Sequence, residues 1–460
     1  MRILQTLGLA LFPWVILPPP LSIWPDREGV WLAPKIFFLA FLTLLFSPKP
    51  APKPALRYPE QSLLLGMLVW LGVASLVALS QQEDSSAWLL GPLNRMDGPL
   101  YHLFLIAFAL RLSRTLAGDP QLVRNLTCIL PLSALFQGTL WLWQRSGLDP
   151  LAGFIGYTPA LPPGTLGNPG MAAGLALPLI PLALALWLER RERVWLLAAL
   201  GLATALGGLA NRSSLIALAL ALGVWVFMSR DRRLTLASLG ALALSYASSA
   251  YWPSTLPVQK QLASGRTLET RLEMWRIGLS LLKEPKTFLF GMGPLGLQEA
   301  VVSGKVEIKN LLQLFHLEYG WPSPERLVSA TPLWEPDDPP TSRAYLLKYD
   351  VTGLPGYSKE EFLALQRLSN LDKAHNAYMD KALAFGTPFA LLWTLFLLGP
   401  IPFLLPRKEP INAGLATGLL SLGVYYLTWF ATPQTEPWHF ALAVLAWQSA
   451  IKTKPSQTSS

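Results

Sequence analysis

The chain is built from a succession of apolar segments, each about as long as a bilayer is thick. A helix needs about 20 mostly apolar residues to cross the hydrocarbon core of a membrane. Twelve segments approach or exceed that length: 3–24, 30–47, 62–80, 98–113, 121–143, 169–188, 194–211, 213–229, 234–252, 382–405, 411–431 and 437–451. The sequence therefore predicts an all-α polytopic membrane protein with about 12 transmembrane helices. The first segment is broken by Pro13 and lacks a small-residue cleavage site, so we expect it to be retained rather than cleaved as a signal peptide.

The composition excludes several classes of soluble protein. Only 14% of the 460 residues are charged and 52% are hydrophobic, whereas charged residues make up about a quarter of a typical soluble domain. These values exclude an ordinary cytosolic enzyme and a disordered chain. The net charge of +9 does not indicate nucleic-acid binding, because Lys and Arg collect in the cytoplasmic loops of membrane proteins. The single cysteine, Cys128, excludes an intrachain disulfide and a zinc cluster.

The basic residues set the orientation of the spans, since every other loop of a polytopic protein should be basic. If the N-terminus is inside, the inner segments hold Lys49, Lys53, Arg57, Arg111, Arg114, Arg124, Arg190, Arg191, Arg193, Arg230, Arg232, Arg233, Arg407, Lys408, Lys452 and Lys454. The short outer loops hold only Arg27, Arg95, Arg145 and Arg212, with Lys35 close by. A miscounted span would invert this bias downstream of the error. The pattern thus predicts that both termini are cytoplasmic.

One connection is too long to be a simple loop. Residues 253–381 form an outer segment with charges of both signs, many prolines and helical patterns of its own. Long loops are translocated regardless of charge, so its basic residues fit the same orientation. We therefore divide the chain into transmembrane helices 1–9 (1–252), an extracytoplasmic loop domain with amphipathic helices (253–381), and transmembrane helices 10–12 with a cytoplasmic tail (382–460).

A tight turn that contains an arginine separates two of the apolar segments. Residues 210–214 read Ala-Asn-Arg-Ser-Ser, and an arginine at the bilayer centre costs about 2.5–3.5 kcal/mol on insertion scales. Arg212 is therefore expected at or just inside the outer surface. Its side chain either extends to the lipid headgroups or faces inward as an anion site. In the second case, the guanidinium binds phosphate oxygens and Ser213 adds a donor at a helix N-terminus.

The outer segment contains a second candidate arginine on an amphipathic helix. Apolar side chains recur there at helical spacing, namely Leu268, Leu272, Trp275, Leu279 and Leu282. Arg271 lies one turn before Trp275 and so borders this apolar face. Its side chain either covers apolar surface with its stem or binds an anion.

A histidine at the predicted outer boundary is the third candidate. The chain has four histidines, and a lone histidine is more often structural than catalytic. His375 lies just before the tenth predicted span, and its ordinary pKa of about 6.5 suits proton transfer near neutrality. The neighbouring Asn376 is placed to orient a polar ligand.

Two acidic pairs and one glycine-rich turn resemble functional motifs. Asp26 with Glu28, and Asp337 with Asp338, have the chemistry to hold a divalent metal against a diphosphate, but solvated turns explain both pairs better. Gly291–Met292–Gly293 lacks the spacing and the strand–loop–helix context of a nucleotide loop. We interpret it as a turn, and the sequence indicates no metal or other cofactor.

Five short motifs occur in an order that resembles a known family. They are Gly167–Asn168–Pro169, Asn211–Arg212–Ser213, Arg271–Leu272–Glu273–Met274–Trp275, Leu289–Phe290–Gly291–Met292–Gly293–Pro294, and His375–Asn376–Ala377–Tyr378 ahead of Phe385–Gly386. Together they look like the O-antigen ligase and O-antigen polymerase superfamily, which also includes bacterial O-oligosaccharyltransferases. The resemblance covers roughly residues 160–400. It departs from the family at Gly170, where many members have Asn, and at Ser213, where they have Gly. Residues 297–370 match no known pattern.

The resemblance implies a function and a site. Members of this superfamily transfer a glycan from an undecaprenyl diphosphate carrier to an acceptor hydroxyl at the outer face of the bacterial inner membrane. They are metal-independent, and their architecture is similar to that of membrane-embedded glycosyltransferases of the GT-C type. Carried over to this chain, the catalytic residues are Arg212, Arg271 and His375, and the substrate-binding residues also include Asn168, Ser213, Trp275 and Asn376.

Arginines fixed around a diphosphate fit this chemistry, because they stabilise the charge that develops on the leaving group. His375 would accept the proton of the acceptor hydroxyl as a general base. The expected partners are the polyprenyl diphosphate-linked glycan, a saccharide or protein acceptor and the lipid bilayer, with no nucleic acid.

Other functions remain open at this stage. Within the superfamily, ligation to a lipid or cell-wall acceptor, protein O-glycosylation and polymerisation are not distinguished. A transporter or flippase for a lipid-linked saccharide would need several ionisable groups deep in the spans, and the sequence places almost none there. A metal-dependent glycosyltransferase would have to use Asp26 and Glu28.

Overall fold

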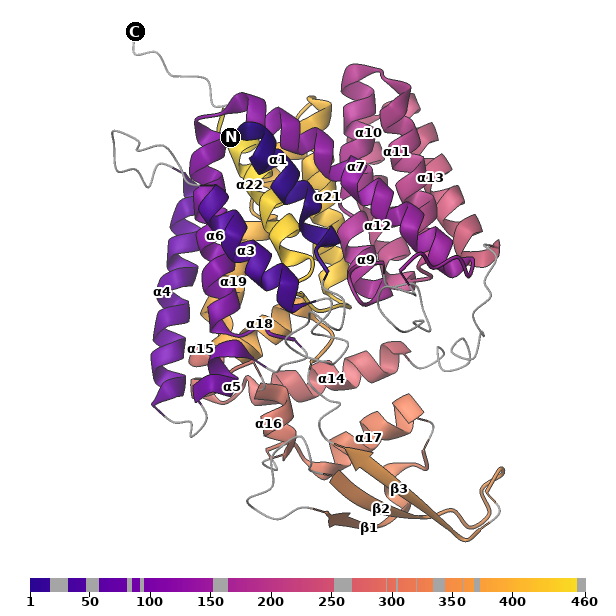
Figure 1. Cartoon of the computed structure of the whole chain (residues 1–460). Coiled ribbons are helices and arrows are strands. Elements are labelled where there is room, and N and C mark those ends of the chain that lie inside the picture. The colour runs from indigo at the N-terminus through magenta and orange to yellow at the C-terminus, as the bar shows by residue number, and fades with distance from the viewer. Residues whose placement is uncertain are drawn as a thin grey trace. The chain divides into compact units, whose positions relative to one another are not determined.

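The computed structural model describes residues 1–16, 32–46, 58–80, 85–91, 95–151, 164–251, 267–294, 296–302, 305–319, 321–333, 344–357, 359–367 and 373–452 of the chain. The described chain is mostly helical (Figure 1). It forms two compact units. The first unit comprises Met1–Trp70, Leu89–Pro257 and Leu391–Ser460, and the second comprises Leu71–Trp88 and Val258–Ala390.

Every one of the twelve apolar segments carries a helix. The helices are α1 (Arg2–Leu11), α3 (Ala33–Leu45), α4 (Pro59–Leu79), α6 (Pro99–Ala117), α7 (Pro120–Arg145), α9 (Pro169–Ala176), α10 (Leu179–Arg190), α11 (Arg193–Gly208), α12 (Arg212–Ser229), α13 (Arg232–Tyr251), α19 (Thr387–Leu398), α20 (Ile401–Leu404), α21 (Pro410–Tyr426) and α22 (Glu436–Lys452). The short helix α5 (Ser85–Leu90) follows α4. The predicted break at Pro13 is confirmed, because α1 gives way to a 3-10 turn over Phe12–Trp14.

Six helical stretches within the described residues are long and apolar enough to cross a membrane. They are Pro59–Leu79, Pro99–Ala117, Pro120–Arg145, Pro169–Arg190, Arg212–Ser229 and Thr387–Leu404. Two further apolar helices, Ala33–Leu45 and Arg193–Gly208, are shorter. These stretches are compatible with a polytopic membrane protein.

Local sequence explains where many of these helices begin. Proline occupies the first position of α6, α7, α9 and α21, where its missing N–H costs nothing and its fixed φ suits the helix. Asp119 caps α7 by accepting the Leu122 N–H at 3.1 Å. These starts lie close to the boundaries that the apolar pattern predicts.

The core of the first unit surrounds α10. The stretch that contains α9 and α10 is almost entirely buried, and α10 packs against α7, α11 and α21. The predicted span 169–188 consists of two helices, α9 and α10, which meet at Leu177 and Pro178. A helix that is apolar on every side is expected in such a central position.

The second unit holds the helices of the predicted outer loop and a small sheet. Its further elements are α14 (Thr267–Leu281), α15 (Pro285–Phe290), α16 (Gly296–Val302), α17 (Ile308–Tyr319), a 3-10 turn (Pro324–Arg326), β1 (Leu327–Pro332), β2 (Ala344–Asp350), β3 (Glu361–Arg367) and α18 (Ala377–Phe385). The strands form an antiparallel sheet in the order β1-β2-β3, with Leu347 opposite Ala330 and Ala364. Leu347 and Tyr349 join Met274 and Phe315 in one buried cluster. The prediction of an all-α chain is thus wrong for residues 327–367.

Candidate functional site

A buried tyrosine links two of the sequence motifs in the first unit. The Tyr425 hydroxyl donates to the Gly170 carbonyl at 2.7 Å and accepts a hydrogen bond from Asn211 Nδ2 at 3.3 Å. Asn168 caps α9, because its Oδ1 accepts the Gly170 N–H at 2.7 Å. The Gly167–Pro169 motif and the Asn211–Ser213 motif therefore meet at one side chain of α21.

An aromatic stack explains the departure at Gly170. A Cβ atom added to Gly170 would lie 2.0 Å from the Trp429 ring, which leaves no room for the Asn that many members of the resembled family carry there. Trp429 stacks on Tyr425 and on Phe430, with ring centroids 6.1 Å and 5.1 Å apart. The Arg95 guanidinium lies 4.4 Å from the centre of the Phe430 ring, a cation–π contact.

The Arg212 turn has the geometry of a capped helix start. Ala210 adopts a left-handed backbone with φ 53°, and Asn211 then caps α12 by accepting the Ser214 N–H at 3.2 Å. Arg212 is the first residue of α12 and is exposed, whereas Ser213 is half-buried. The side chain of Arg212 therefore lies beside the positive end of a helix dipole, which adds to its attraction for an anion.

We expect the Tyr425→Phe variant to be less stable than the wild type by about 1–3 kcal/mol, because Asn211 and the Gly170 carbonyl would each lose a buried partner. The measurement is the midpoint of thermal unfolding in detergent. Tyr246→Phe is the matched control, since Tyr246 is 69% exposed. Equal midpoints for the two variants would show that the tyrosine does not hold the two motifs together.

His375 lies in a strained turn at the start of α18. Its backbone is left-handed, with φ 53°, a conformation that is uncommon for residues other than glycine and that often marks functional sites. Asn376 caps α18 by accepting the Met379 N–H at 3.1 Å, and Asp380 Oδ1 accepts the Ala374 N–H at 2.7 Å. These two bonds fix the backbone on both sides of the half-buried histidine.

Two buried lysines near His375 were not expected from the sequence. Lys373 and Lys381 are 6% and 4% exposed, so two cationic side chains are buried within six residues of the histidine. Burial also raises the pKa of Tyr378 well above its usual range. Lys373 precedes the His375–Tyr378 motif and Lys381 follows it. Their closeness to this motif was the only feature of the sequence that could have pointed to them.

The helix with Arg271 is confirmed, but only Trp275 and Leu282 of its predicted apolar face pack against the buried cluster of the second unit. Leu268, Leu272 and Leu279 are 62%, 50% and 57% exposed, whereas Arg271 and Trp275 are half-buried. The face that packs into the second unit is instead formed by Thr270, Met274, Ile277 and Leu281.

Helices α14 and α18 are packed together in the second unit. The Met379 side chain lies directly over Gly278 of α14. Gly278 is seven residues, and therefore two helical turns, after Arg271 and so shares its side of α14. Arg271 therefore lies on α14, His375 lies just before α18, and these two helices are in direct contact.

The glycine-rich turn after α15 supports the end of α18. The Met292 and Gly293 N–H groups donate to the carbonyls of Leu383 and Ala384 at 2.6 Å and 3.0 Å, so the turn satisfies carbonyls that a helix end leaves open. Gly386 follows with φ 87°, and a Cβ there would meet the Leu289 carbonyl at 1.9 Å. The interpretation of Gly291–Gly293 as a turn is confirmed.

Buried ionisable side chains are more prominent in the helices than the sequence indicated. Lys35 is fully buried, and its Nζ donates to the carbonyls of Val15 and Thr165 at 2.8 Å and 2.6 Å. His439 Nε2 lies 3.0 Å from a carbonyl of α9 and must therefore be the donor, so Nδ1 accepts from the Tyr426 hydroxyl at 2.6 Å. The prediction that the spans hold almost no ionisable groups needs correction at these positions.

The acidic pairs cannot be placed. Asp26, Glu28, Asp337 and Asp338 all lie outside the described residues. Within the described residues, no group of three His, Cys, Asp or Glu side chains has the arrangement of a metal site.

The site residues thus form two clusters, one in each unit. Asn168, Arg212 and Ser213 belong to the first unit, where Tyr425 connects their motifs. The second unit holds the others, Arg271, Trp275, His375 and Asn376. Comparisons with protein-family models, with curated proteins and with solved structures found no match for this chain.

Proposed function

We propose that this protein is a glycosyltransferase that moves a glycan from a polyprenyl diphosphate carrier to an acceptor hydroxyl at the outer face of the bacterial inner membrane. In this proposal all twelve apolar segments span the bilayer, both termini are cytoplasmic, and the architecture is of the GT-C type. The five motifs in order and the chemistry of their residues support the proposal.

The observation that carries it is the geometry of His375. Its left-handed backbone is fixed by the Asn376 cap and by the bond from the Ala374 N–H to Asp380. A strained backbone costs about 1–3 kcal/mol and persists only where surrounding contacts impose it. A half-buried histidine on a backbone held in this way has a fixed starting point for its side chain, which supports the role of a general base.

In the proposed reaction, His375 accepts the proton of the acceptor hydroxyl while its oxygen bonds to the anomeric carbon of the glycan. The bond from that carbon to the diphosphate oxygen breaks at the same time, and the polyprenyl diphosphate leaves with the electron pair. Attack from the side opposite the diphosphate inverts the anomeric configuration.

Arg212 and Arg271 bind the diphosphate in this proposal. Charge on the leaving group grows in the transition state, so preset guanidinium groups lower the barrier rather than merely bind the substrate. Asn168 and Ser213 would add polar contacts beside Arg212, while Asn376 and Trp275 would contact the saccharide. Two arginines make a metal ion unnecessary for neutralising the diphosphate.

A transporter for a lipid-linked saccharide is the second candidate, and the buried ionisable groups favour it. Besides Lys35, Glu60 is fully buried on α4, where its Oε1 accepts from Ser113 Oγ at 3.0 Å and from Gln448 Nε2 at 2.9 Å. Such groups mark transport paths in many membrane proteins. A flipping assay in liposomes with a lipid-linked saccharide separates the two candidates, since a transferase leaves the carrier on its original side.

We expect excess chelator to leave glycan transfer unchanged, because the proposed charge stabilisation comes from arginines. The assay uses the purified protein in detergent, with lipid-linked glycan and acceptor extracted from the cells that produce it. A known magnesium-dependent glycosyltransferase serves as the control and must lose activity. If the chelator inactivates this protein as well, the acidic pairs hold a metal and the arginine proposal is wrong.

Disruption of the gene tests the function in the cell. The proposal predicts that one surface polymer or glycoprotein loses its sugar and that carrier-linked glycan accumulates. The molecule that loses its sugar is also the acceptor. Its identity decides between ligation, protein glycosylation and polymerisation. Unchanged surface glycans with no accumulation of carrier would contradict the proposal.

A further inference from the structure

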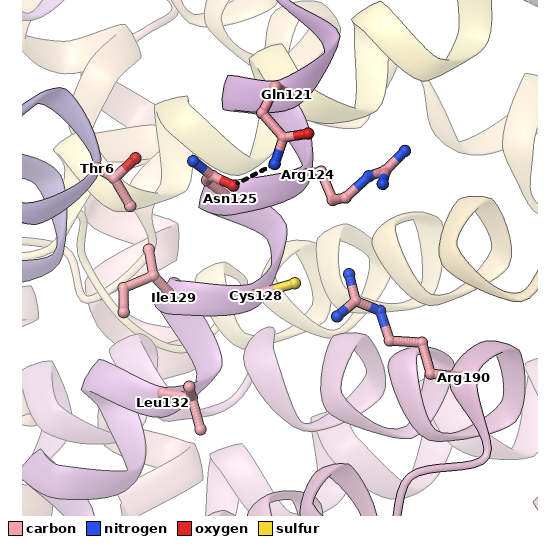
Figure 2. Close-up of a pocket in the computed structure, with 8 residues that line it drawn as sticks. All are labelled: Thr6, Gln121, Arg124, Asn125, Cys128, Ile129, Leu132 and Arg190. Atoms are coloured by element: carbon pink, nitrogen blue, oxygen red, sulfur yellow. Dashed lines mark hydrogen bonds between the residues drawn. The ribbon is translucent and has the colours of Figure 1, made fainter. Parts of the chain in front are cut away.

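A pocket of about 400 Å³ lies between α1, α7 and α10 of the first unit (Figure 2). Its lining residues are Thr6, Gln121, Arg124, Asn125, Cys128, Ile129, Leu132 and Arg190. None of them belongs to the candidate site described above. Six of the eight come from α7, so this helix forms one wall of the pocket.

The guanidinium groups of two arginines lie on the same side of α7 (Figure 2). In Figure 2 the Arg190 side chain extends from α10 toward the Cys128 sulfur, and Arg124 projects from α7 on the same side. Both arginines lie close enough to Cys128 to act on its thiol electrostatically. The Arg190 guanidinium is also held 5.7 Å from the centre of the Trp195 ring. Glu192 acts on the same thiol with the opposite sign. Guanidinium groups match phosphate oxygens in geometry.

Two other polar side chains of the pocket are bonded to each other. Gln121 Nε2 donates to Asn125 Oδ1 at 2.9 Å, and the Asn125 amide nitrogen points toward Thr6 of α1, on the other side of α7 from Arg124 and Arg190 (Figure 2).

The polarity of the wall changes along α7. Gln121, Arg124 and Asn125 lie on its first turns, whereas Ile129 and Leu132 follow one to two turns later. From residue 121 to residue 132 the helix rises by about 16 Å at about 1.5 Å per residue. The α7 wall of the pocket is thus polar at one end and apolar at the other. A wall of this length and pattern suits an amphiphile better than a small soluble anion.

We propose that this pocket binds the phosphate headgroup of an anionic phospholipid, with the guanidinium groups of Arg124 and Arg190 on the phosphate and an acyl chain beside Ile129 and Leu132. The positively charged loops of the sequence place the start of α7 and the end of α10 at the inner membrane face, where basic pockets between helices bind anionic headgroups. The occupied pocket would tie α7 to α10, two helices that pack in the core of the first unit.

Cys128 makes the proposal directly testable, because it is the only cysteine in the chain and it lines the pocket. The full-length protein is reconstituted in vesicles of phosphatidylcholine, with or without phosphatidylglycerol, and the rate of Cys128 alkylation by N-ethylmaleimide is measured. We expect phosphatidylglycerol to slow alkylation by about tenfold when it is present at ten times its dissociation constant, because occupied protein is protected.

The variants Arg124→Gln and Arg190→Gln distinguish the pocket from the general effect of a charged membrane. In each variant, Cys128 should be alkylated at nearly the same rate in vesicles with and without phosphatidylglycerol. Arg191→Gln is the matched control, since Arg191 is adjacent in sequence but does not line the pocket, and it should keep the wild-type ratio of these two rates. Arg124 is exposed, so its replacement leaves the fold intact.

Three results would overturn the proposal. The first is equal alkylation rates for the wild type in the two kinds of vesicle. The second is protection that persists in Arg124→Gln and Arg190→Gln, which would reflect the membrane surface alone. The third is equal protection by inorganic phosphate in phosphatidylcholine vesicles, which would assign the pocket to a soluble anion.

Discussion

The His375→Ala variant is expected to lose glycan transfer by about a hundredfold or more, the smaller end of what a general base contributes. The acceptor hydroxyl would then have no group to take its proton as it attacks the anomeric carbon. The fold should persist, because the bonds from the Met379 N–H to Asn376 and from the Ala374 N–H to Asp380 remain in the variant. The measurement is the rate of transfer by purified protein at saturating lipid-linked glycan.

His316→Ala is the matched control for this variant. His316 also lies in the second unit, where its ring contacts the Trp321 carbonyl, and no step of the proposed reaction uses it. It should transfer glycan at close to the wild-type rate. A loss of only severalfold in His375→Ala, or an equal loss in both variants, would make His375 a structural residue.

The Arg212→Ala and Arg271→Ala variants are each expected to lower transfer by about a hundredfold to a thousandfold, comparable with the loss of one donor that stabilises transition-state charge. Lysine at either position should restore only part of the activity, because an ammonium group does not make the bidentate contact of a guanidinium. The measurement is the same transfer assay, together with the amount of each variant inserted in the membrane.

The chain offers a close control for each arginine. Arg276 lies on α14 with Arg271, but its side chain is 76% exposed and pairs with Glu273, so Arg276→Ala should be fully active. Arg233→Ala serves in the same way for Arg212, since Arg233 is exposed in a predicted inner loop. Near-normal transfer by both Arg212→Ala and Arg271→Ala would contradict the proposal that these arginines bind the diphosphate.

Local signals in the sequence predicted much of the helical structure. Each of the twelve segments chosen by apolar length carries a helix, and the preference of Asn for helix caps explains the starts at Asn168, Asn211 and Asn376. Both kinds of signal act over a few neighbouring residues. They are therefore visible without knowledge of the fold.

Features that depend on distant contacts were missed. Asn211 and Tyr425 are 214 positions apart, and nothing near either residue indicates the other. The aromatic run up to Phe430 was interpreted only as part of a span, so the stack with Trp429 and the contact with Arg95 were not expected.

The error on α14 has a specific physical cause. Residues 270, 274, 277 and 281 repeat at the same helical spacing as the leucine stripe from Leu268 to Leu282, so periodicity alone does not distinguish the two faces. The larger number of leucines favoured the stripe of which Leu268, Leu272 and Leu279 are in fact exposed. The sheet was missed for a related reason, because β1 and β3 are exposed along much of their length and lack a clear alternation of apolar and polar residues.

The proposed function requires that Arg212 and Arg271 each contribute to binding of the donor's diphosphate. Its most direct test is the affinity of the purified protein for undecaprenyl diphosphate, compared with undecaprenol, which lacks the diphosphate. The proposal predicts that Arg212→Ala and Arg271→Ala each weaken undecaprenyl diphosphate binding by about tenfold or more, the effect of about 1.5–3 kcal/mol for a hydrogen bond to a charged group, and leave undecaprenol binding unchanged. Wild-type affinity for the diphosphate in either variant would contradict it.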